Sequence, residues 1–171
     1  MLRSDLSTSE YNSYYHNYIL ALPDVALMDE LKDGKEQLLS FVGTIPNERL
    51  NYAYAVGKWT VAQVLMHIVD AERIFQYRAL RFARNDKTPL VGFEQDNFVL
   101  ESTADIRTKK EILNEYRTVR EATISLFASF DDIVLKRMGT ASGSGMSVRA
   151  MGFIICGHQT HHLKIIGERY L

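Results

Sequence analysis

Three of the five histidines are spaced in a way that suits metal binding. His158 and His162 lie four residues apart near the C-terminus, and His67 lies much earlier in the chain. Residues four apart on a helix are stacked neighbours with Cβ atoms roughly 5–6 Å apart, so two such imidazoles can bind one ion. A third imidazole from a facing helix would leave one position open, as in catalytic zinc sites, which combine three protein ligands with water.

Other common metal motifs are missing from the chain. A di-iron site in a helical bundle needs a Glu-x-x-His step on each of two helices, and no histidine here has a glutamate three residues before it. The His-Glu-x-x-His motif of zinc proteases is also absent. Cys156 precedes His158 by two residues and so falls on another helix face, where we expect it to be buried and not a ligand.

The apolar residues around the three histidines predict that all three point into a helical core. On the last predicted helix the inward positions advance in steps of four and three, the spacing of a bundle core: Met151, Ile155, His158, His162 and Ile165. His67 belongs to a similar series on an earlier helix: Val64, His67, Ala71 and Ile74. His161 lies off this line, and we expect it at the rim or in solvent.

A purely structural explanation of the histidines stays open. Each could be a hydrogen-bonded core residue, and those on the last helix would also suit its negative end. For a single histidine this explanation would be the better one. A buried imidazole without a partner is unfavourable, so a pair four residues apart together with a third inward histidine favours a metal. For His16, in a tyrosine-rich opening, we predict only packing.

Four long helices are predicted to carry these residues. The first spans residues 9–42 and is interrupted near Pro23, because proline removes a backbone donor. The second begins at Thr60, where Thr60-Val61-Ala62-Gln63 has the form of a capping box, and ends near residue 84. The third runs from residue 102 or 103 to 130, and the fourth is capped by Ser147 and ends at 170. With loops at 85–101 and 140–145, this predicts an all-α four-helix bundle with at least one long crossover connection.

Composition narrows the class of protein. The chain has 171 residues, of which 20 are basic and 21 acidic, so we expect one domain over residues 1–171 and no attraction to nucleic acid. No apolar run is long enough for a membrane span, and a secretory leader is not evident. The single Cys156 fits a reducing cytoplasm. A cluster of arginines is predicted to form a solvated helix flank and not a phosphate-binding patch: Arg73, Arg78, Arg81 and Arg84.

Several segments resemble the DinB-like family, also called YfiT-like. The stretch 59–73 (WTVAQVLMHIVDAER), followed by 77–84 (YRALRFAR), resembles the second helix of that family. The ending 158–166 (HQTHHLKII) is similar to its last helix, and 92–96 (GFEQD) is similar to its long connection. The resemblance covers essentially the whole chain in order and spacing, and the histidine triad is its most specific part.

The resemblance implies a four-helix bundle with a long crossover, often dimeric, that binds a divalent ion such as nickel or zinc. Matched residue by residue, the ligands are His67, His158 and His162. Some relatives are thiol transferases or thiol-dependent isomerases that use bacillithiol, mycothiol or glutathione, and many are labelled hydrolases. The implied partners are a small-molecule substrate, a low-molecular-weight thiol for the transferases, and a second copy of the chain. Many members carry Gly-Gln shortly after the last histidine, whereas this chain has Leu163-Lys164, so the substrate class is not fixed.

An ion at this site would act as a Lewis acid and acidify water or a thiol. Asp70 and Glu72 are candidates for general base or for partners of the ligands, although exposed helix carboxylates are an equally open explanation. Glu94 and Asp96 could reach the open position from the long loop. Since only neutral imidazole binds metal, we expect affinity to fall below about pH 6. The alternative to an enzyme is a non-catalytic helical dimer with a structural metal, or one that binds a small molecule or a protein.

Overall fold

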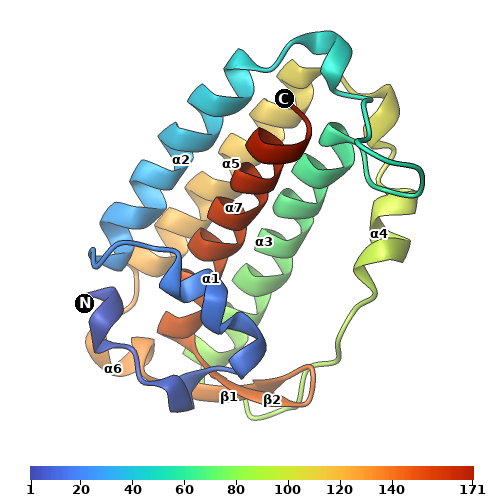
Figure 1. The fold of residues 1–171 in the computed structure, drawn as a ribbon. Coiled ribbons are helices and arrows are strands. Elements are labelled where there is room, and N and C mark those ends of the chain that lie inside the picture. Colours follow the sequence, from blue (N-terminus) through green and yellow to red (C-terminus); the bar gives the residue numbers. More distant parts are fainter.

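Four long helices form a bundle in the structure, a computed structural model that describes residues 1–171 (Figure 1). They are α2 (Leu27–Thr44), α3 (Val61–Ala83), α5 (Lys109–Ala128) and α7 (Val148–Arg169). The shorter elements are α1 (His16–Leu20), α4 (Gln95–Glu101), α6 (Asp132–Leu135), β1 (Met138–Ala141) and β2 (Ser144–Ser147). Single 3-10 turns cover Arg3–Asp5, Thr8–Glu10, Ser13–Tyr15, Asn47–Arg49 and Ala104–Ile106. The predicted four-helix bundle is confirmed.

The connections between the long helices include a crossover along the bundle. α2 packs against α5 and α7, and α3 packs against the same two helices. Figure 1 shows α2 and α7 running in one direction and α3 and α5 in the other. The chain must therefore return along the bundle between α3 and α5, and α4 lies in this connection. The long crossover expected from the sequence is thus present.

Side-chain caps fix the starts of α3 and α7 where the sequence predicted them. The Thr60 hydroxyl accepts a hydrogen bond from the backbone N–H of Gln63 (3.2 Å), and the Gln63 amide oxygen accepts one from the backbone N–H of Thr60 (2.9 Å). This reciprocal pair is the predicted capping box. Ser147 caps α7 by accepting a hydrogen bond from the backbone N–H of Ala150 (3.0 Å).

The predicted bounds of two other helices are wrong. α5 does not begin at residue 102 or 103, because Thr103 has a left-handed backbone (φ 52°) and a capping box at Thr108 starts the helix instead. The first predicted helix breaks around Pro23 as expected, but only α1 and 3-10 turns precede the break. α2 continues past Gly43 to Thr44 and stops before Pro46, since a residue that precedes proline disfavours the helical backbone.

Residues 140–145, predicted as a loop, belong to a β-hairpin. β1 and β2 pair antiparallel, with Ala141 opposite Ser144, and the turn between them has positive φ at Ser142 (50°) and Gly143 (73°). Positive φ at both central residues is the mark of a type I′ turn, which matches the twist of a two-stranded ribbon. The hairpin is fastened to the crossover, because the backbone N–H of Ser142 donates to the carbonyl oxygen of Leu90 (2.9 Å).

α7 is the most enclosed of the long helices. Every residue from Val148 to Gln159 is buried, because α1, α2 and α3 all pack against it. α1 approaches so closely at Gly157 that a Cβ there would lie 2.2 Å from the carbonyl oxygen of Tyr18.

No helix in the structure is both long enough and apolar enough to cross a membrane.

Replacing Gly157 by alanine is expected to lower the free energy of unfolding by about 1–3 kcal/mol, because α1 must move away from α7. Urea denaturation measures the change. Gly43→Ala is the matched control, since Gly43 lies in α2 with nothing within 4 Å of the added Cβ. It should stabilise the helix by up to about 1 kcal/mol. Equal effects of the two variants would contradict the close approach of α1.

Candidate metal centre

His67, His158 and His162 meet between α3 and α7. The Nε2 atom of His158 lies 2.9 Å from Nε2 of His67 and 3.1 Å from Nε2 of His162. His67 and His158 are buried, and His162 is half-buried. Nitrogen ligands 2.0–2.1 Å from one tetrahedral ion lie about 3.3 Å from each other. The three imidazoles brought together by the fold therefore fit a single ion with small adjustments.

Aromatic neighbours hold the imidazole rings in place. The indole of Trp59 packs on His67 with ring centroids 4.9 Å apart, and Tyr18 of α1 meets His158 edge-on at 5.7 Å. The hydroxyl of Tyr170, just beyond α7, donates to the carbonyl oxygen of Trp59 (2.9 Å). This contact joins the end of α7 to the residues that precede α3. The two helices that supply the histidines are thus linked directly beside the site.

Burial keeps the imidazoles in the neutral form that binds metal. It lowers the pKa of His67 to about 4, although the negative charge of Asp96 acts in the opposite direction. Burial also lowers the pKa of His162 to about 3, helped by His67 and His161. The pKa of His158 is held well below its usual range by burial and by the other histidines. The sequence predicted that metal affinity falls below about pH 6. In the folded chain the fall should begin at a lower pH, because the imidazoles take up protons only there.

The lowered pKa values predict that the metal-free protein loses stability in acid. An unfolded histidine has a pKa near 6.5, so below that pH the unfolded chain binds protons that folded His67 and His162 do not take up until about pH 4 and 3. Between pH 7 and 5 each of the two histidines should lower the free energy of unfolding by about 2 kcal/mol. Urea denaturation at both pH values measures the loss. His162→Ala should show a smaller loss, and an equal loss in that variant would contradict the assignment.

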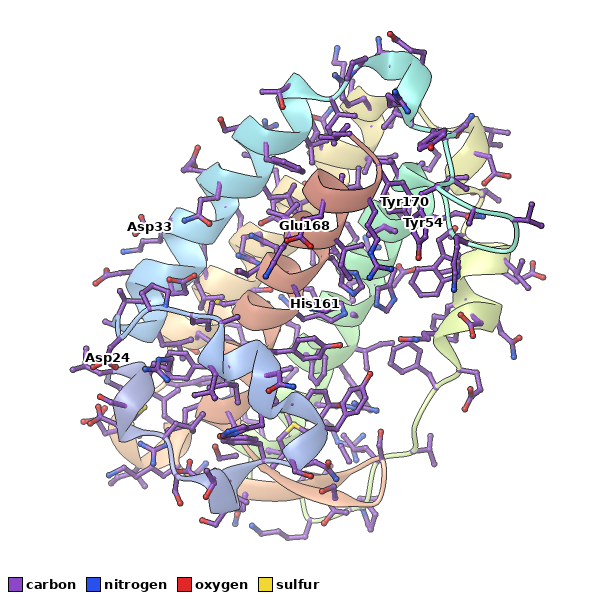
Figure 2. All side chains as sticks on the ribbon, in the orientation of Figure 1. Asp24, Asp33, Tyr54, His161, Glu168 and Tyr170 are labelled. Carbon is purple, nitrogen blue, oxygen red and sulfur yellow. The ribbon has the colours of Figure 1, made fainter.

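The histidines line a cavity of about 480 Å³. Glu94 and Asp96, at the start of α4, line the same cavity, so the crossover does reach the site as the sequence indicated. A second cavity of about 340 Å³ shares His162 and Asp96 with the first. Tyr54 and Tyr170 line this second space, and Figure 2 shows them close together near the end of α7. Two cavities therefore meet at the candidate centre.

His161 lies at the rim of the site. It is partly exposed and packs against Tyr18, with ring centroids 4.9 Å apart. Figure 2 labels His161 on α7. Cys156 is buried and belongs to the apolar core, and burial raises the pKa of its thiol to about 12. His16 is hydrogen-bonded to the hydroxyl of Tyr11 (3.1 Å). None of these three residues belongs to the group of converging ligand atoms.

The structure does not bring Asp70 or Glu72 to the histidines. Asp70 forms an ion pair with Arg73 (3.7 Å) and lines a different cavity. Glu72 lies five residues after His67, which places it well around the helix from the imidazole. Its carboxylate is bound by Arg120 of α5, with distances of 2.7 and 2.8 Å to Nε and Nη2. Both carboxylates therefore have charged partners away from the site.

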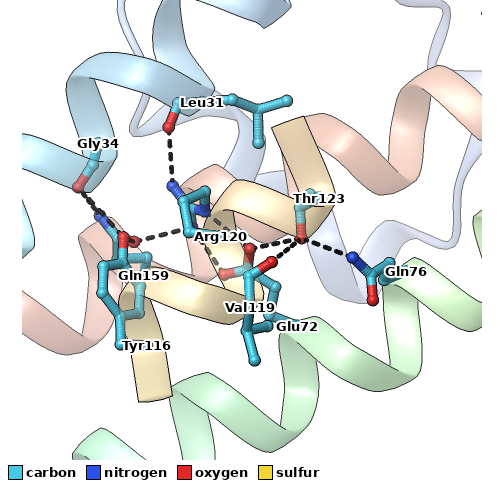
Figure 3. Close-up of polar contacts among 9 residues, drawn as sticks. All are labelled: Leu31, Gly34, Glu72, Gln76, Tyr116, Val119, Arg120, Thr123 and Gln159. Atoms are coloured by element: carbon cyan, nitrogen blue, oxygen red, sulfur yellow. Dashed lines mark hydrogen bonds and ion pairs between the residues drawn. The ribbon is translucent and has the colours of Figure 1, made fainter. Parts of the chain in front are cut away.

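Glu72 and Arg120 form the centre of a buried polar network that reaches all four long helices (Figure 3). The Arg120 guanidinium also donates to the side-chain oxygen of Gln159 (2.8 Å) on α7 and to the carbonyl oxygen of Leu31 (3.2 Å) on α2. Gln159 in turn donates to the carbonyl oxygen of Gly34 (2.7 Å). Since Gln159 directly follows His158, this network fixes the rotation of α7 that turns His158 toward the site.

Arg78 differs from the prediction of a solvated arginine flank. Its side chain lines the cavity of the histidines and the residue is only 3% exposed. Its Nη2 donates to the carbonyl oxygen of Val91 and to the hydroxyl of Ser142, both at 3.0 Å. Sequence reasoning missed this residue because the hairpin that covers it was taken for a loop. The helical spacing of Arg78 from His67 was the available signal.

Residues 30–166 match the DinB superfamily. This chain belongs to the DinB superfamily. Two curated relatives are similar over most of their length: a protein of Oceanobacillus iheyensis (22% identical over 153 residues, 84% of this chain and 87% of the relative) and one of Geobacillus thermodenitrificans (30% over 144 residues, 81% and 77%). Both are named as metal-dependent hydrolases, with the activity marked in the name as unproven.

Two solved structures share the fold of this DinB superfamily chain. YfiT from Bacillus subtilis, described as a probable metal-dependent hydrolase with an unusual four-helix bundle topology, has a TM-score of 0.75 at 17% identity, over 93% of this chain and 91% of YfiT. A mycothiol-dependent maleylpyruvate isomerase has a TM-score of 0.70 at 12% identity, over 84% of this chain and 61% of the isomerase. Together with the histidine cluster, the named relatives support a divalent metal in this chain.

Proposed function

We propose that this protein is a divalent-metal-dependent enzyme that acts on a small molecule, with hydrolysis as its reaction. The observation that carries the proposal is the convergence of three neutral imidazoles at the wall of a cavity. His67, His158 and His162 would hold the ion, and their nitrogen donors suit zinc or nickel. A divalent ion in such a site supplies a Lewis acid that makes a nucleophile available near neutral pH.

The residues around the histidines have separate roles in this proposal. Asp96, the carboxylate that lines both cavities, would accept a proton from the nucleophile. Burial raises the pKa of Tyr18, so its phenol stays protonated and can donate a hydrogen bond to a substrate oxygen. Trp59 holds the ring of His67 and shields it from water. The chain thus provides a proton acceptor, a hydrogen-bond donor and an apolar wall beside the donor set.

A purely structural metal fits the geometry less well. Structural zinc sites are closed by four protein ligands, whereas only three ligand side chains converge here and they face open space. The buried network around Arg120 already joins the four helices without an ion. A metal that served only to stabilise the bundle would duplicate that role.

A thiol in place of water is the second candidate, favoured by the two cavities that meet at His162 and Asp96. One cavity would take the electrophilic substrate and the other a low-molecular-weight thiol. The fold shared with a mycothiol-dependent isomerase is consistent with this arrangement. The oligomeric state stays a prediction, with a homodimer expected.

The test uses metal-free protein reconstituted with zinc or with nickel. Hydrolysis of small activated esters and amides is measured without a thiol, and substrate consumption is then measured with bacillithiol, mycothiol or glutathione. We expect turnover that requires the ion and is lost in His158→Ala. Turnover without added thiol identifies a hydrolase, and strict dependence on one thiol identifies a transferase. Failure of the metal-loaded protein to exceed His158→Ala with every substrate and thiol would contradict an enzymatic role.

A further inference from the structure

Arg78 is a buried cation without an acidic partner. It is 3% exposed, yet no aspartate or glutamate forms an ion pair with it, and its two protein acceptors are a carbonyl and a hydroxyl oxygen. The other two buried arginines both have an acidic partner, Glu72 for Arg120 and Glu10 for Arg149. Burying a charge without a counter-charge is unfavourable. A buried guanidinium of this kind is therefore suited to an anion that arrives from outside the chain.

Both hydrogen bonds to protein atoms use Nη2 of Arg78. Neither Nε nor Nη1 donates a hydrogen bond to a protein acceptor. Neither atom is fully buried, so both can be reached by a ligand. A guanidinium carries five N–H donors in a rigid fork that matches the two oxygens of a carboxylate. Arg78 thus has free donors at the wall of the cavity that also contains the histidines.

The hairpin turn and Phe75 fix the position of Arg78. Ser142, which accepts from Nη2, has a left-handed backbone (φ 50°) that a residue other than glycine rarely adopts. The guanidinium carbon lies 5.7 Å from the centre of the Phe75 ring. The free donors are therefore held in a defined place by two elements, α3 and the hairpin. Such preorganisation favours ligand binding.

Helical spacing aligns Arg78 with the metal centre. His67, Ala71, Phe75 and Arg78 all line the same cavity, because steps of four, four and three keep residues on one face of a helix. Eleven residues separate the Cα atoms of His67 and Arg78 by about 16 Å along α3. Both side chains project from the same face of α3, so a ligand that touches both groups must be elongated, on the order of 10–15 Å.

We propose that Arg78 binds the carboxylate at one end of an elongated substrate whose other end reaches the histidine centre. The inference rests on the proposed function, because that function makes the histidines the reacting end. A single carboxylate matches the single guanidinium, which is the only arginine or lysine head group that lines the cavity. A phosphate monoester carries more charge near neutral pH, and Glu94 and Asp96 in the same cavity would repel the excess.

The test measures calorimetric binding of linear dicarboxylates, from succinate to sebacate, to the zinc-loaded protein. Monocarboxylates of the same chain lengths are measured in parallel. We expect affinity to peak at one of the longer dicarboxylates, at least tenfold tighter than the matching monocarboxylate. Arg78→Gln should remove that advantage while zinc content stays unchanged, and Arg78→Lys should keep part of it, since lysine retains the charge without the fork.

The matched control is Arg81→Gln. Arg81 lies on the same helix, is half-exposed and forms an ion pair with Asp86. This variant should leave the affinities within twofold of the wild type. If Arg78→Gln does not fold, Arg78→Lys provides the comparison, and undiminished binding by that folded variant overturns the proposal. The proposal is also overturned if the wild type shows no preference for one dicarboxylate length, or if the affinity of Arg78→Gln peaks at the same length and to the same height.

Failure of this inference can be told from failure of the proposed function. If the chain takes up neither zinc nor nickel, the proposed function fails. The inference is then decided by whether long monocarboxylates bind to the metal-free protein and lose that binding in Arg78→Gln. If zinc is bound through the histidines but no carboxylate depends on Arg78, the proposed function stands and the inference fails.

Discussion

Replacing Glu72 by alanine should lower the free energy of unfolding by about 3–5 kcal/mol, because Arg120 would be left buried without a counter-charge. Burial alone would lower the pKa of Arg120, but the facing carboxylate of Glu72 raises it above its ordinary value, so the guanidinium stays charged in the core. Urea denaturation of the metal-free protein at neutral pH measures the effect. A loss of this size is a large part of the free energy of unfolding of an ordinary domain.

The control for this prediction is Glu168→Ala on α7. Glu168 and Lys164 are 3.8 Å apart and exposed, so the change should stay within about 0.5 kcal/mol. A double variant, Glu72→Leu with Arg120→Met, should recover most of the loss, because it removes both charges and fills the space with apolar atoms. A Glu72→Ala variant as stable as Glu168→Ala would show that the buried pair does not hold the bundle together.

Replacing His158 by alanine should weaken zinc or nickel binding on the order of 100-fold or more. The expectation follows from its central place, since its Nε2 is the atom that lies within hydrogen-bond distance of both other histidines. Changes to residues that only orient a ligand already weaken metal binding by about 10–100-fold, so loss of a ligand should exceed that range. Competition with a chromophoric chelator measures the affinity.

His16→Ala is the matched control for His158→Ala. It also removes a histidine, but one that contacts Tyr11 and lies outside the converging group. Its metal affinity should equal that of the wild type. An unchanged affinity in His158→Ala, with the chain still folded, would assign the ion to other residues.

The histidine cluster could be predicted from the sequence because it depends on periodicity alone. A four-residue step on one helix and an inward position on another determine which way the imidazoles point, and only the packing of α3 on α7 had to be added. The start of α3 at Thr60 and that of α7 at Ser147 were predictable for a related reason, since capping is local to a few residues.

The partners of charged residues could not be predicted in the same way. Glu72 and Arg120 come from different helices, and Arg78 meets Ser142 from a distant hairpin. The hairpin itself was hidden because its turn relies on a serine with positive φ, whereas the usual type I′ sequences are Asn-Gly or Asp-Gly. The role of each carboxylate and arginine therefore depends on tertiary contacts that the periodic pattern does not contain.

The most direct test of the metal centre is elemental analysis by mass spectrometry of the untagged protein, beside the variants His67→Ala and His158→Ala. We predict about one zinc, nickel or similar divalent ion per chain in the wild type, and its loss in both variants. A wild type that holds no such ion after reconstitution, or variants that retain it in full, would contradict a three-histidine metal site.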